Sequence, residues 1–375
     1  MGGRITALDV LRGVAILGTL GTNIWIFTHP DGPGGFLTGA DDWGEALLRM
    51  VSNGKFLGLL SILFGIGLAL QHASAVKRGQ KWPGWYLWRS ALLLFEGLLH
   101  YVLIFEFDVL MFYAIVSVLV AFLVGRSDRV VRAWLGGALV LHLAFVGLVT
   151  WAMHLGDGSL GGSLGGSLPV DNTSWLGQVQ SRIEFLDVFR AEIVFVLPLS
   201  TVLFLAGVRL VRAGALEDSE RGLRIQRRLA GWGLGLGLPL NVVTTLAGGE
   251  WFAVDRYVSA PIVSFGLLGA ITMLVHRMRS PEGFLRRGVT SVGRSALSCY
   301  IAQNVIASVL CYQWGLNLTG RLGHLGVWYT IGAWVVVSAL LVLGASWWMK
   351  RFSRGPVEAA WNWAYRAPQR RPVSA

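Results

Sequence analysis

The stretch AWLGGALVLHLAFVGLVTWAM, residues 133–153, decides the fold class of this chain. It contains no Asp, Glu, Lys or Arg. An α-helix rises about 1.5 Å per residue, so about 20 apolar residues are needed to cross about 30 Å of hydrocarbon. This stretch meets that requirement, and similar apolar runs recur along the whole chain. We therefore predict an all-α fold, a polytopic integral membrane bundle that forms a single transmembrane domain.

The apolar runs predict about ten transmembrane helices. Their expected bounds are 8–27, 51–72, 86–105, 109–125, 133–153, 191–212, 229–247, 256–276, 291–313 and 326–348. A long outer loop, 154–190, separates the fifth and sixth spans. Within it, the repeated Gly-Gly-Ser-Leu pattern of 159–168 is typical of a flexible linker. A basic cytoplasmic tail, 349–375, follows the last span.

The composition supports a membrane protein and indicates its orientation. Of the 375 residues, 54% are hydrophobic and 14% are charged, which is more apolar surface than an ordinary soluble domain buries. If Met1 is cytoplasmic, 25 of the 32 Lys and Arg residues fall on the cytoplasmic side. The positive-inside rule therefore predicts that both termini are cytoplasmic. Because these residues are dispersed over short loops, the net charge of +11 does not indicate a nucleic-acid partner.

Two further patterns limit the function classes. Asp9 and Arg12 interrupt the first apolar run, and no small-residue cleavage site follows it, so we expect it to stay attached rather than act as a cleaved signal. Cys299 and Cys311 share one predicted span but lie on different faces of it, too far apart to bridge. The sequence therefore implies neither a disulfide framework nor a metal site.

Glycine and proline residues inside the spans favour close helix packing and one kink. The glycines of 231–237 lie in an apolar run with no preceding strand, so helix packing is a better interpretation than a nucleotide loop. The same interpretation covers Gly65 and Gly67. Pro239 is expected to kink the seventh span and to free backbone groups near Asn241.

Charged residues in the first span form one candidate site. Asp9 and Arg12 are three residues apart, so they share a helix face and can pair near the cytoplasmic end. Asn23 follows Arg12 on nearly the same face, about 16 Å further along the axis, and Thr19 lies on the same stripe. An ionisable residue at membrane depth is a functional candidate by default. The alternative is that Asp9 and Arg12 only anchor the helix end at the headgroups.

The third and fourth spans carry the main catalytic candidates. Glu96 and His100 are one helical turn apart, so the carboxylate can orient the imidazole. Glu106 and Asp108 begin the next span. These residues predict a titratable cluster in the outer half of the membrane, where an imidazole accepts a proton from an attacking hydroxyl or amine. The alternative is a histidine that only hydrogen-bonds within the core.

Three weaker candidates each have a plain structural alternative. His29, with the acidic residues of the first outer loop, is a second catalytic or acceptor-binding candidate, or part of a solvated loop. The polar run 293–304 is a candidate for ligand contact, and the structural alternative is that it only joins helices by hydrogen bonds. The arginines of 221–228 hold cofactor phosphates or merely set topology. The acidic loop residues are Asp31, Asp41, Asp42 and Glu45.

Several of these motifs together resemble a known family. They are Arg4 to Gly18 with Asn23-Ile24; Gly54-Lys55-Phe56 and Leu63 to Gly67; Gly97 to His100 with Asp108 to Leu110; Leu205-Ala206-Gly207; 293–303; and Gly355 to Glu358 with Trp361. In this combination and order they resemble the YeiB-like family of bacterial membrane proteins, which carry a C-terminal domain of unknown function. The similarity covers nearly the whole chain. One departure is Phe107, where the family pattern usually shows Gly before the Asp.

That family is similar to a broader group of transmembrane acyltransferases, which includes the heparan-glucosaminide acetyltransferase. In that group an acyl-CoA bound from the cytosol delivers its acyl group to an acceptor on the far side, and a membrane His is central to the transfer. The resemblance implies that Asp9, Arg12 and Asn23 lie near the donor path. It also implies that His100, with Glu96 and Asp108, is the general base or transient acyl carrier, with His29 as the alternative reactive histidine.

The leading hypothesis is therefore an acyltransferase of the bacterial cytoplasmic membrane. Acyl-CoA would be its co-substrate, without a metal, and the acceptor a glycan, a lipid headgroup or a small molecule with a hydroxyl or amine. The rivals are a proton-coupled transporter or lipid flippase, and a noncatalytic scaffold or sensor. Membrane lipids are the other expected partners, and a homo-oligomer is left open. The hypothesis requires the charged and imidazole side chains to meet in one lipid-sheltered cavity.

Overall fold

The computed structural model describes residues 6–30, 32, 40, 43–155, 170–278 and 283–370. Within these ranges the chain forms helices and no strands, which confirms the all-α prediction. The long helices are α1 (Thr6–Thr28), α4 (Lys55–Lys77), α5 (Trp85–Leu103), α6 (Leu110–Leu123), α7 (Asp128–Leu155), α11 (Ile193–Ala213), α12 (Glu220–Gly235), α15 (Ala260–Arg277), α17 (Ala296–Cys311) and α19 (Val327–Arg351).

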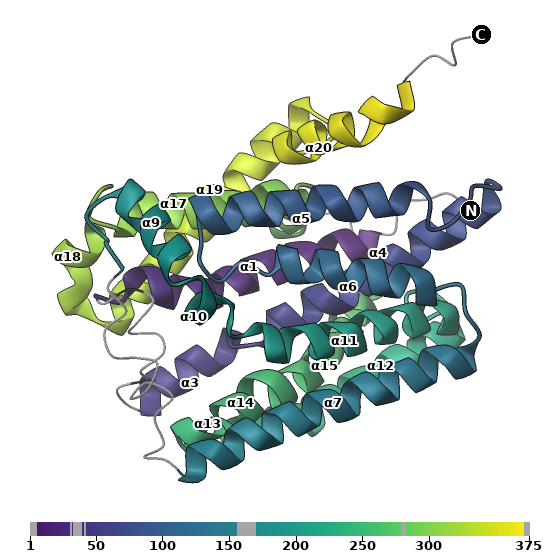
Figure 1. The fold of residues 1–375 in the computed structure, drawn as a ribbon, viewed down its shortest axis with the longest axis horizontal. Coiled ribbons are helices and arrows are strands. Elements are labelled where there is room, and N and C mark those ends of the chain that lie inside the picture. Colours follow the sequence, from purple (N-terminus) through teal and green to yellow (C-terminus); the bar gives the residue numbers. More distant parts are fainter. Residues whose placement is uncertain are drawn as a thin grey trace.

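Shorter helices connect the long ones or flank them. They are α3 (Trp43–Ser52), α9 (Trp175–Glu184), α10 (Leu186–Arg190), α13 (Gly237–Leu246), α14 (Phe252–Val254), α16 (Phe284–Arg294), α18 (Leu318–Leu322), α20 (Pro356–Arg366), the 3-10 turns Gly249–Trp251, Gly323–Leu325 and Ala367–Arg370, and the π-helical segment η2 (Asp255–Ser259). The long helices run roughly side by side along the horizontal axis of Figure 1, with α9 and α18 at one end of the bundle and α20 outside it.

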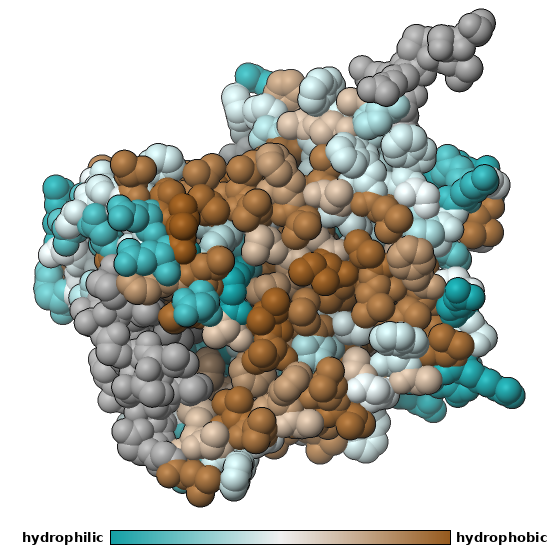
Figure 2. All heavy atoms as spheres, viewed as in Figure 1, coloured by the Kyte–Doolittle hydropathy of each residue, from teal (hydrophilic) through white to brown (hydrophobic). Residues whose placement is uncertain are grey.

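The bundle has the surface of a membrane protein. Seven helical segments in the described ranges are long and apolar enough to cross a membrane, and α6 and α17 are shorter apolar helices. Apolar side chains form a broad belt between more hydrophilic ends (Figure 2). On α7, for example, Val140 is 70% exposed. Each predicted span falls on or overlaps a helix of the structure, whereas the number of spans and their sidedness stay predictions.

Glycine and proline residues shape the helices much as expected. Pro239 lacks the N–H that a continuous helix needs. The helix is interrupted at Leu236, between α12 and α13, where the sequence predicted a kink. A Cβ on Gly233 would lie 2.3 Å from the Gly266 backbone nitrogen, so α12 and α15 approach closely there. A Cβ on Gly231 would meet no atom of another helix within 4 Å, so close packing explains only part of this glycine run.

The closest approach that involves the first helix is between α1 and α16. A Cβ on Gly293 would lie 1.7 Å from the Asp9 carbonyl oxygen, and one on Gly13 would lie 2.1 Å from the Val289 carbonyl oxygen. The atoms in the way belong to the backbone, so rotating a side chain cannot relieve either clash. These two glycines therefore set the distance between α16 and α1, the helix that carries Asp9, Arg12 and Asn23.

We expect Gly293→Ala to destabilise the bundle by about 1–3 kcal/mol, because α1 and α16 must separate to admit the methyl group. The matched control is Gly231→Ala, which has open space around it and replaces a poor helix former. Cys299 and Cys311 are buried free thiols, so a thiol-reactive dye can follow unfolding in detergent. A Gly293→Ala midpoint at or above that of Gly231→Ala would contradict the packing argument.

Candidate functional site

A buried histidine and aspartate form the centre of the candidate site. His100 on α5 and Asp108, just before α6, are 1% and 0% exposed, and His100 Nδ1 lies 2.9 Å from Asp108 Oδ1. The other carboxylate oxygen accepts hydrogen bonds from the backbone N–H groups of Leu110, at 2.9 Å, and Met111, at 3.3 Å. Asp108 therefore caps the start of α6 and holds the imidazole at the same time.

Two asparagines continue this hydrogen-bond chain. Asn304 Nδ2 lies 3.2 Å from His100 Nε2, and Asn23 Nδ2 donates to Asn304 Oδ1 at 3.2 Å. An amide nitrogen only donates, so Nε2 of a neutral His100 accepts and Nδ1 carries the proton given to Asp108. The Tyr300 ring packs 5.1 Å from the imidazole, and its hydroxyl donates to Asp108 Oδ1 at 3.4 Å. We call these five residues the histidine network.

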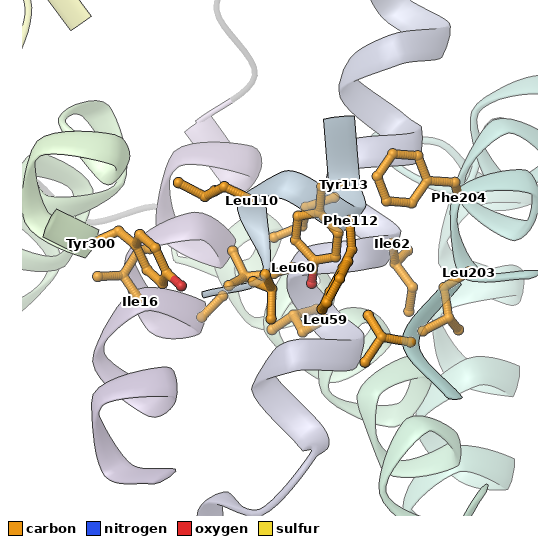
Figure 3. Close-up of a cluster of buried hydrophobic side chains, with 14 of the residues drawn as sticks. Ile16, Leu59, Leu60, Ile62, Leu110, Phe112, Tyr113, Leu203, Phe204 and Tyr300 are labelled. Carbon is orange, nitrogen blue, oxygen red and sulfur yellow. The ribbon is translucent and has the colours of Figure 1, made fainter. Parts of the chain in front are cut away.

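The histidine network borders a cavity of about 300 Å³. Asn23 and Tyr300 line this cavity, whereas His100 and Asp108 lie behind them. The remaining walls are mostly apolar and come from α1, α4, α7, α10, α11 and α14. Tyr300 also sits at the edge of the buried apolar cluster, beside Ile16 (Figure 3). The cavity is therefore a mostly apolar chamber within the helix bundle that the network reaches through Asn23 and Tyr300.

A second polar wall of the same cavity lies where α11 begins. Arg256 donates to Glu192 Oε1 through Nε and Nη2, both at 3.1 Å, and Tyr257 donates its hydroxyl to the same oxygen at 2.5 Å. Arg256 also donates to Asn53 Oδ1 at 2.6 Å. Glu192, Arg256 and Tyr257 all line the cavity. The paired charges supply polar groups to this wall without a large net charge.

The π-helical segment η2 that carries Arg256 is fixed by Asp255. Oδ1 of Asp255 accepts hydrogen bonds from Asn241, at 2.5 Å, and from Thr244 and Thr245, both at 2.9 Å. Oδ2 accepts from Asn53 at 3.0 Å. Asn241, which the sequence placed beside the Pro239 kink, thus bonds across to the next segment. π-Helical turns occur frequently at functional sites, and this one aims Arg256 and Tyr257 at the cavity.

Two arginines that the sequence analysis did not single out hold the turn that carries Asp108. Arg182 on α9 pairs with Glu106 at 3.2 Å and donates to the carbonyl oxygens of Val102 and Ile104. Arg190 on α10 donates to the carbonyl oxygens of Asp108, at 2.8 Å, and Glu106. Both are among the few basic residues on the predicted outer side. That departure from the positive-inside pattern was the available signal.

Glu96 does not have the role that the sequence predicted. It was expected to orient His100, but the carboxylate bonded to His100 belongs to Asp108. Both carboxylate oxygens of Glu96 are buried without a hydrogen-bond partner among the described residues. Helical periodicity correctly placed Glu96 and His100 on one face, but the turn after α5 brings a nearer carboxylate to the imidazole.

Asp9 and Arg12 form the expected pair at the other end of α1, with 3.7 Å between Arg12 Nη1 and Asp9 Oδ1. Arg12 is 37% exposed, and neither residue lines the cavity that Asn23 borders. Buried apolar residues of α1, Ile16 among them, lie between this pair and Asn23. The structure therefore joins Asn23 to His100 and Asp108 and leaves Asp9 and Arg12 apart from them, so the single cavity shared by all of these side chains, which the sequence hypothesis required, is not formed.

The weaker candidates are also separate from the histidine network. His29 is half-buried just beyond the end of α1 and does not line the cavity. Glu45 pairs with Arg49 at 2.5 Å. Asp31, Asp41 and Asp42, the other acidic residues of the first outer loop, lie outside the described residues. The glycine-serine repeat of 159–168 lies outside them as well. The arginines of 221–228 are exposed on α12.

The polar run 293–304 contains a helix break, and only part of it reaches the imidazole. The predicted ninth span is two helices, α16 and α17, that meet at Ser295. Glu358 on α20 accepts hydrogen bonds from the first N–H groups of α17, those of Leu297 at 2.8 Å and Ser298 at 3.2 Å. The start of α17 is therefore capped from the C-terminal helix. Further along α17, Tyr300 and Asn304 supply the contacts to His100.

Comparison with known proteins finds a matching family model and similar bacterial proteins. A family model described as a protein of unknown function (DUF418) matches residues 210–367. The chain is 26% identical to the uncharacterized protein YxaH of Bacillus subtilis (strain 168) over 394 residues, which cover 96% of this chain and 93% of YxaH. It is 28% identical to the uncharacterized protein YeiB of Escherichia coli (strain K12) over 387 residues, which cover 96% of this chain and 95% of YeiB. Over nearly its whole length the chain is therefore similar to YeiB and YxaH. No solved structure matches it.

The resemblance to YeiB-like proteins inferred from the sequence motifs is thus confirmed. Phe107, the position at which the motifs of this chain depart from the expected pattern, lines the cavity. Its ring packs edge-on against that of Phe189, with 5.8 Å between centroids and 89° between planes. Phe189 lines the cavity as well. Phe107 therefore forms part of the cavity wall next to Asp108, which is bonded to His100.

Proposed function

We propose that this protein is a transmembrane acyltransferase of the bacterial cytoplasmic membrane. It would move an acyl group such as acetyl from cytosolic acyl-CoA to a hydroxyl or amine of an acceptor near the outer side. The observation that supports this best is the buried Asp108–His100 pair, which connects through Asn304 and Asn23 to the wall of a cavity. A carboxylate bonded to an imidazole is the arrangement of general-base catalysis.

The proposed chemistry uses Nε2 of His100. The acceptor displaces the Asn304 amide from Nε2, gives its proton to this nitrogen, and its oxygen or nitrogen forms a bond to the thioester carbonyl carbon. The C–S bond breaks, and the leaving sulfur takes the proton back from the imidazolium. Asp108 stabilises the imidazolium between these two steps. The released Asn304 amide and the Tyr300 hydroxyl would donate hydrogen bonds to the negative charge on the carbonyl oxygen.

The donor side of this proposal rests on Arg12. Its exposed guanidinium near the predicted cytoplasmic end of α1 is a cation that suits the phosphates of a CoA thioester. Asn23, about 16 Å further along the same helix, borders the cavity. A CoA molecule bound at Arg12 with its pantetheine arm along α1 would bring the thioester toward Asn23. Asp9, paired with Arg12, would orient the guanidinium and not contact the acyl group.

One observation favours a rival, proton-coupled transport. The broken helix α12–α13 and the π-helical segment η2 meet at the buried Asp255, and interrupted helices with buried carboxylates are typical of transporter binding sites. Transport would still not require a thioester. The two functions therefore differ in whether purified protein turns over acyl-CoA.

The test uses protein reconstituted into vesicles of bacterial polar lipid extract, with radiolabelled acetyl-CoA supplied outside and label measured in lipid and soluble fractions. Transfer or slow hydrolysis by the wild type, absent in His100→Ala, is the expected result. His29→Ala is the matched control, because it removes the alternative histidine. Acetyl-CoA turnover that survives in His100→Ala, or no turnover by the wild type with any acceptor fraction, would dispose of the proposal.

A further inference from the structure

An apolar groove on the lipid-facing surface adjoins the cavity. It has a volume of about 690 Å³ and runs between α6, α7 and α11. Its residues include Leu119, Trp134, Leu141 and Leu197. Val194, near the start of α11, lines both the groove and the cavity. Val194 also follows Glu192 closely in the chain, so the apolar groove meets the polar wall of the cavity at this point.

The cavity itself is amphipathic. Asn23 and Tyr300 of the histidine network, with Thr19 and Thr22 on α1, supply its polar groups on one side. Glu192, Arg256 and Tyr257 supply them at the other wall. The surface between these places is mostly apolar. A ligand that fills this space needs hydrogen-bonding groups at its ends and apolar surface elsewhere. A free sugar or nucleotide lacks the apolar part that this lining requires, whereas a polar headgroup joined to a hydrocarbon chain supplies both.

We infer that the acceptor is a membrane amphiphile with a hydroxyl- or amine-bearing headgroup and a long hydrocarbon chain. The headgroup occupies the cavity, and the chain passes Val194 to lie in the groove between α6, α7 and α11. This inference rests on the proposed function for the reaction at the headgroup. The binding mode follows from the shared lining of groove and cavity and is tested without acyl transfer.

Glu192 indicates the headgroup chemistry. Its Oε1 receives three hydrogen bonds, two from Arg256 and one from Tyr257. Within the described residues Oε2 receives none, so this oxygen is available to accept from a hydroxyl or an ammonium group. Because the charge of Glu192 is already balanced by Arg256, the wall carries no spare cation for a strongly anionic headgroup. A sugar, glycerol or amine headgroup fits these groups better than a phosphate does.

The ligand's hydrocarbon chain must pass the wall between the membrane and the cavity, and this wall is thin. Most of α7 faces outward, and its buried residues are only Val131, His142, Val146 and Met153. Of these, His142 ties α7 to the cavity side, because its Nε2 lies 2.9 Å from the Tyr257 carbonyl oxygen. α7 otherwise packs mainly against α11, so lateral access from the membrane passes between these two helices at the groove. A lipid reaches the cavity by this route without leaving the bilayer.

The binding mode is tested by placing photoreactive p-benzoylphenylalanine at Val194 and, as the matched control, at Val140, which is exposed on α7 outside the groove. After illumination in native membranes, the adducts are identified by intact mass. We expect Val194 to capture one sugar- or amine-bearing lipid class at least fivefold more than Val140, which samples bulk lipid. The same adduct composition at both positions would overturn the inference.

A second pair of variants separates this inference from the proposed function. Ala138→Trp fills the groove, whereas Val140→Trp adds the same ring outside it. Ala138→Trp is expected to abolish the Val194 enrichment, and Val140→Trp to leave it unchanged. Enrichment that persists with the groove filled would contradict the position of the lipid's hydrocarbon chain in the groove. If the enrichment behaves as expected but no variant turns over acetyl-CoA, the proposed function fails and the amphiphile site stands.

Discussion

Replacing Asp108 with asparagine is expected to lower the rate of acyl transfer by about 10² to 10⁴-fold. The carboxylate accepts the Nδ1 proton of His100 at 2.9 Å, which leaves Nε2 free of a proton. An asparagine amide in its place donates to Nδ1 and so moves the imidazole proton to Nε2, the atom that must accept from the acceptor. The change also removes the negative charge that stabilises the imidazolium during transfer.

The fold should tolerate this substitution better than the chemistry does. The second function of Asp108 is to cap α6 by accepting from Leu110 and Met111, and an asparagine oxygen caps a helix about as well. We therefore expect kcat to fall, the KM for acetyl-CoA to stay within about twofold, and the unfolding midpoint to change little. Activity within about threefold of wild type would show that Asp108 only caps α6.

Most of the fold was predictable because hydrocarbon thickness constrains a membrane chain strongly. The run 133–153 lies inside α7, and the run 8–27 nearly coincides with α1. The helices missed were those that need not cross hydrocarbon, such as α3, α9 and α20. A window of about 20 apolar residues cannot detect them. The break at Ser295 was missed for a different reason, since it is stabilised by Glu358 from a distant part of the chain.

The candidate site was predicted in its residue types but not in its pairings. The cost of burying polar groups singled out Asn23, His100 and Asp108, which the structure links by hydrogen bonds through Asn304. Helical spacing then favoured Glu96 as the partner of His100, since no sequence rule gives the geometry of the 104–109 turn. That geometry depends on Arg182 and Arg190, which follow about 80 residues later. The second polar wall was missed because Glu192 and the neighbours Arg256 and Tyr257 lie on two segments that are 64 residues apart in the chain.

Replacing Arg182 with alanine is expected to destabilise the protein by about 3–5 kcal/mol. Arg182 and Glu106 are only 3% and 2% exposed, so the change strands a carboxylate without its counter-charge. It also strands the carbonyl oxygens of Val102 and Ile104 at the end of α5, which Arg182 bonds in the wild type. The turn that carries Asp108 then loses one of its two arginine supports, so we expect transfer activity to fall as well.

Two further variants test whether the effect of Arg182→Ala comes from the buried ion pair. Asp128→Asn removes a charge from the pair that Asp128 forms with Arg212, and it should cost at most about 1 kcal/mol because the aspartate is 68% exposed. Glu106→Gln combined with Arg182→Ala should be less destabilised than Arg182→Ala alone, because the buried charge is gone. The midpoints are measured by titration with sodium dodecyl sulfate in mixed micelles, with thiol-dye labelling of the two cysteines as readout. If Arg182→Ala and Asp128→Asn unfold at the same midpoint, the ion pair does not hold the turn, and the position of Asp108 needs another explanation.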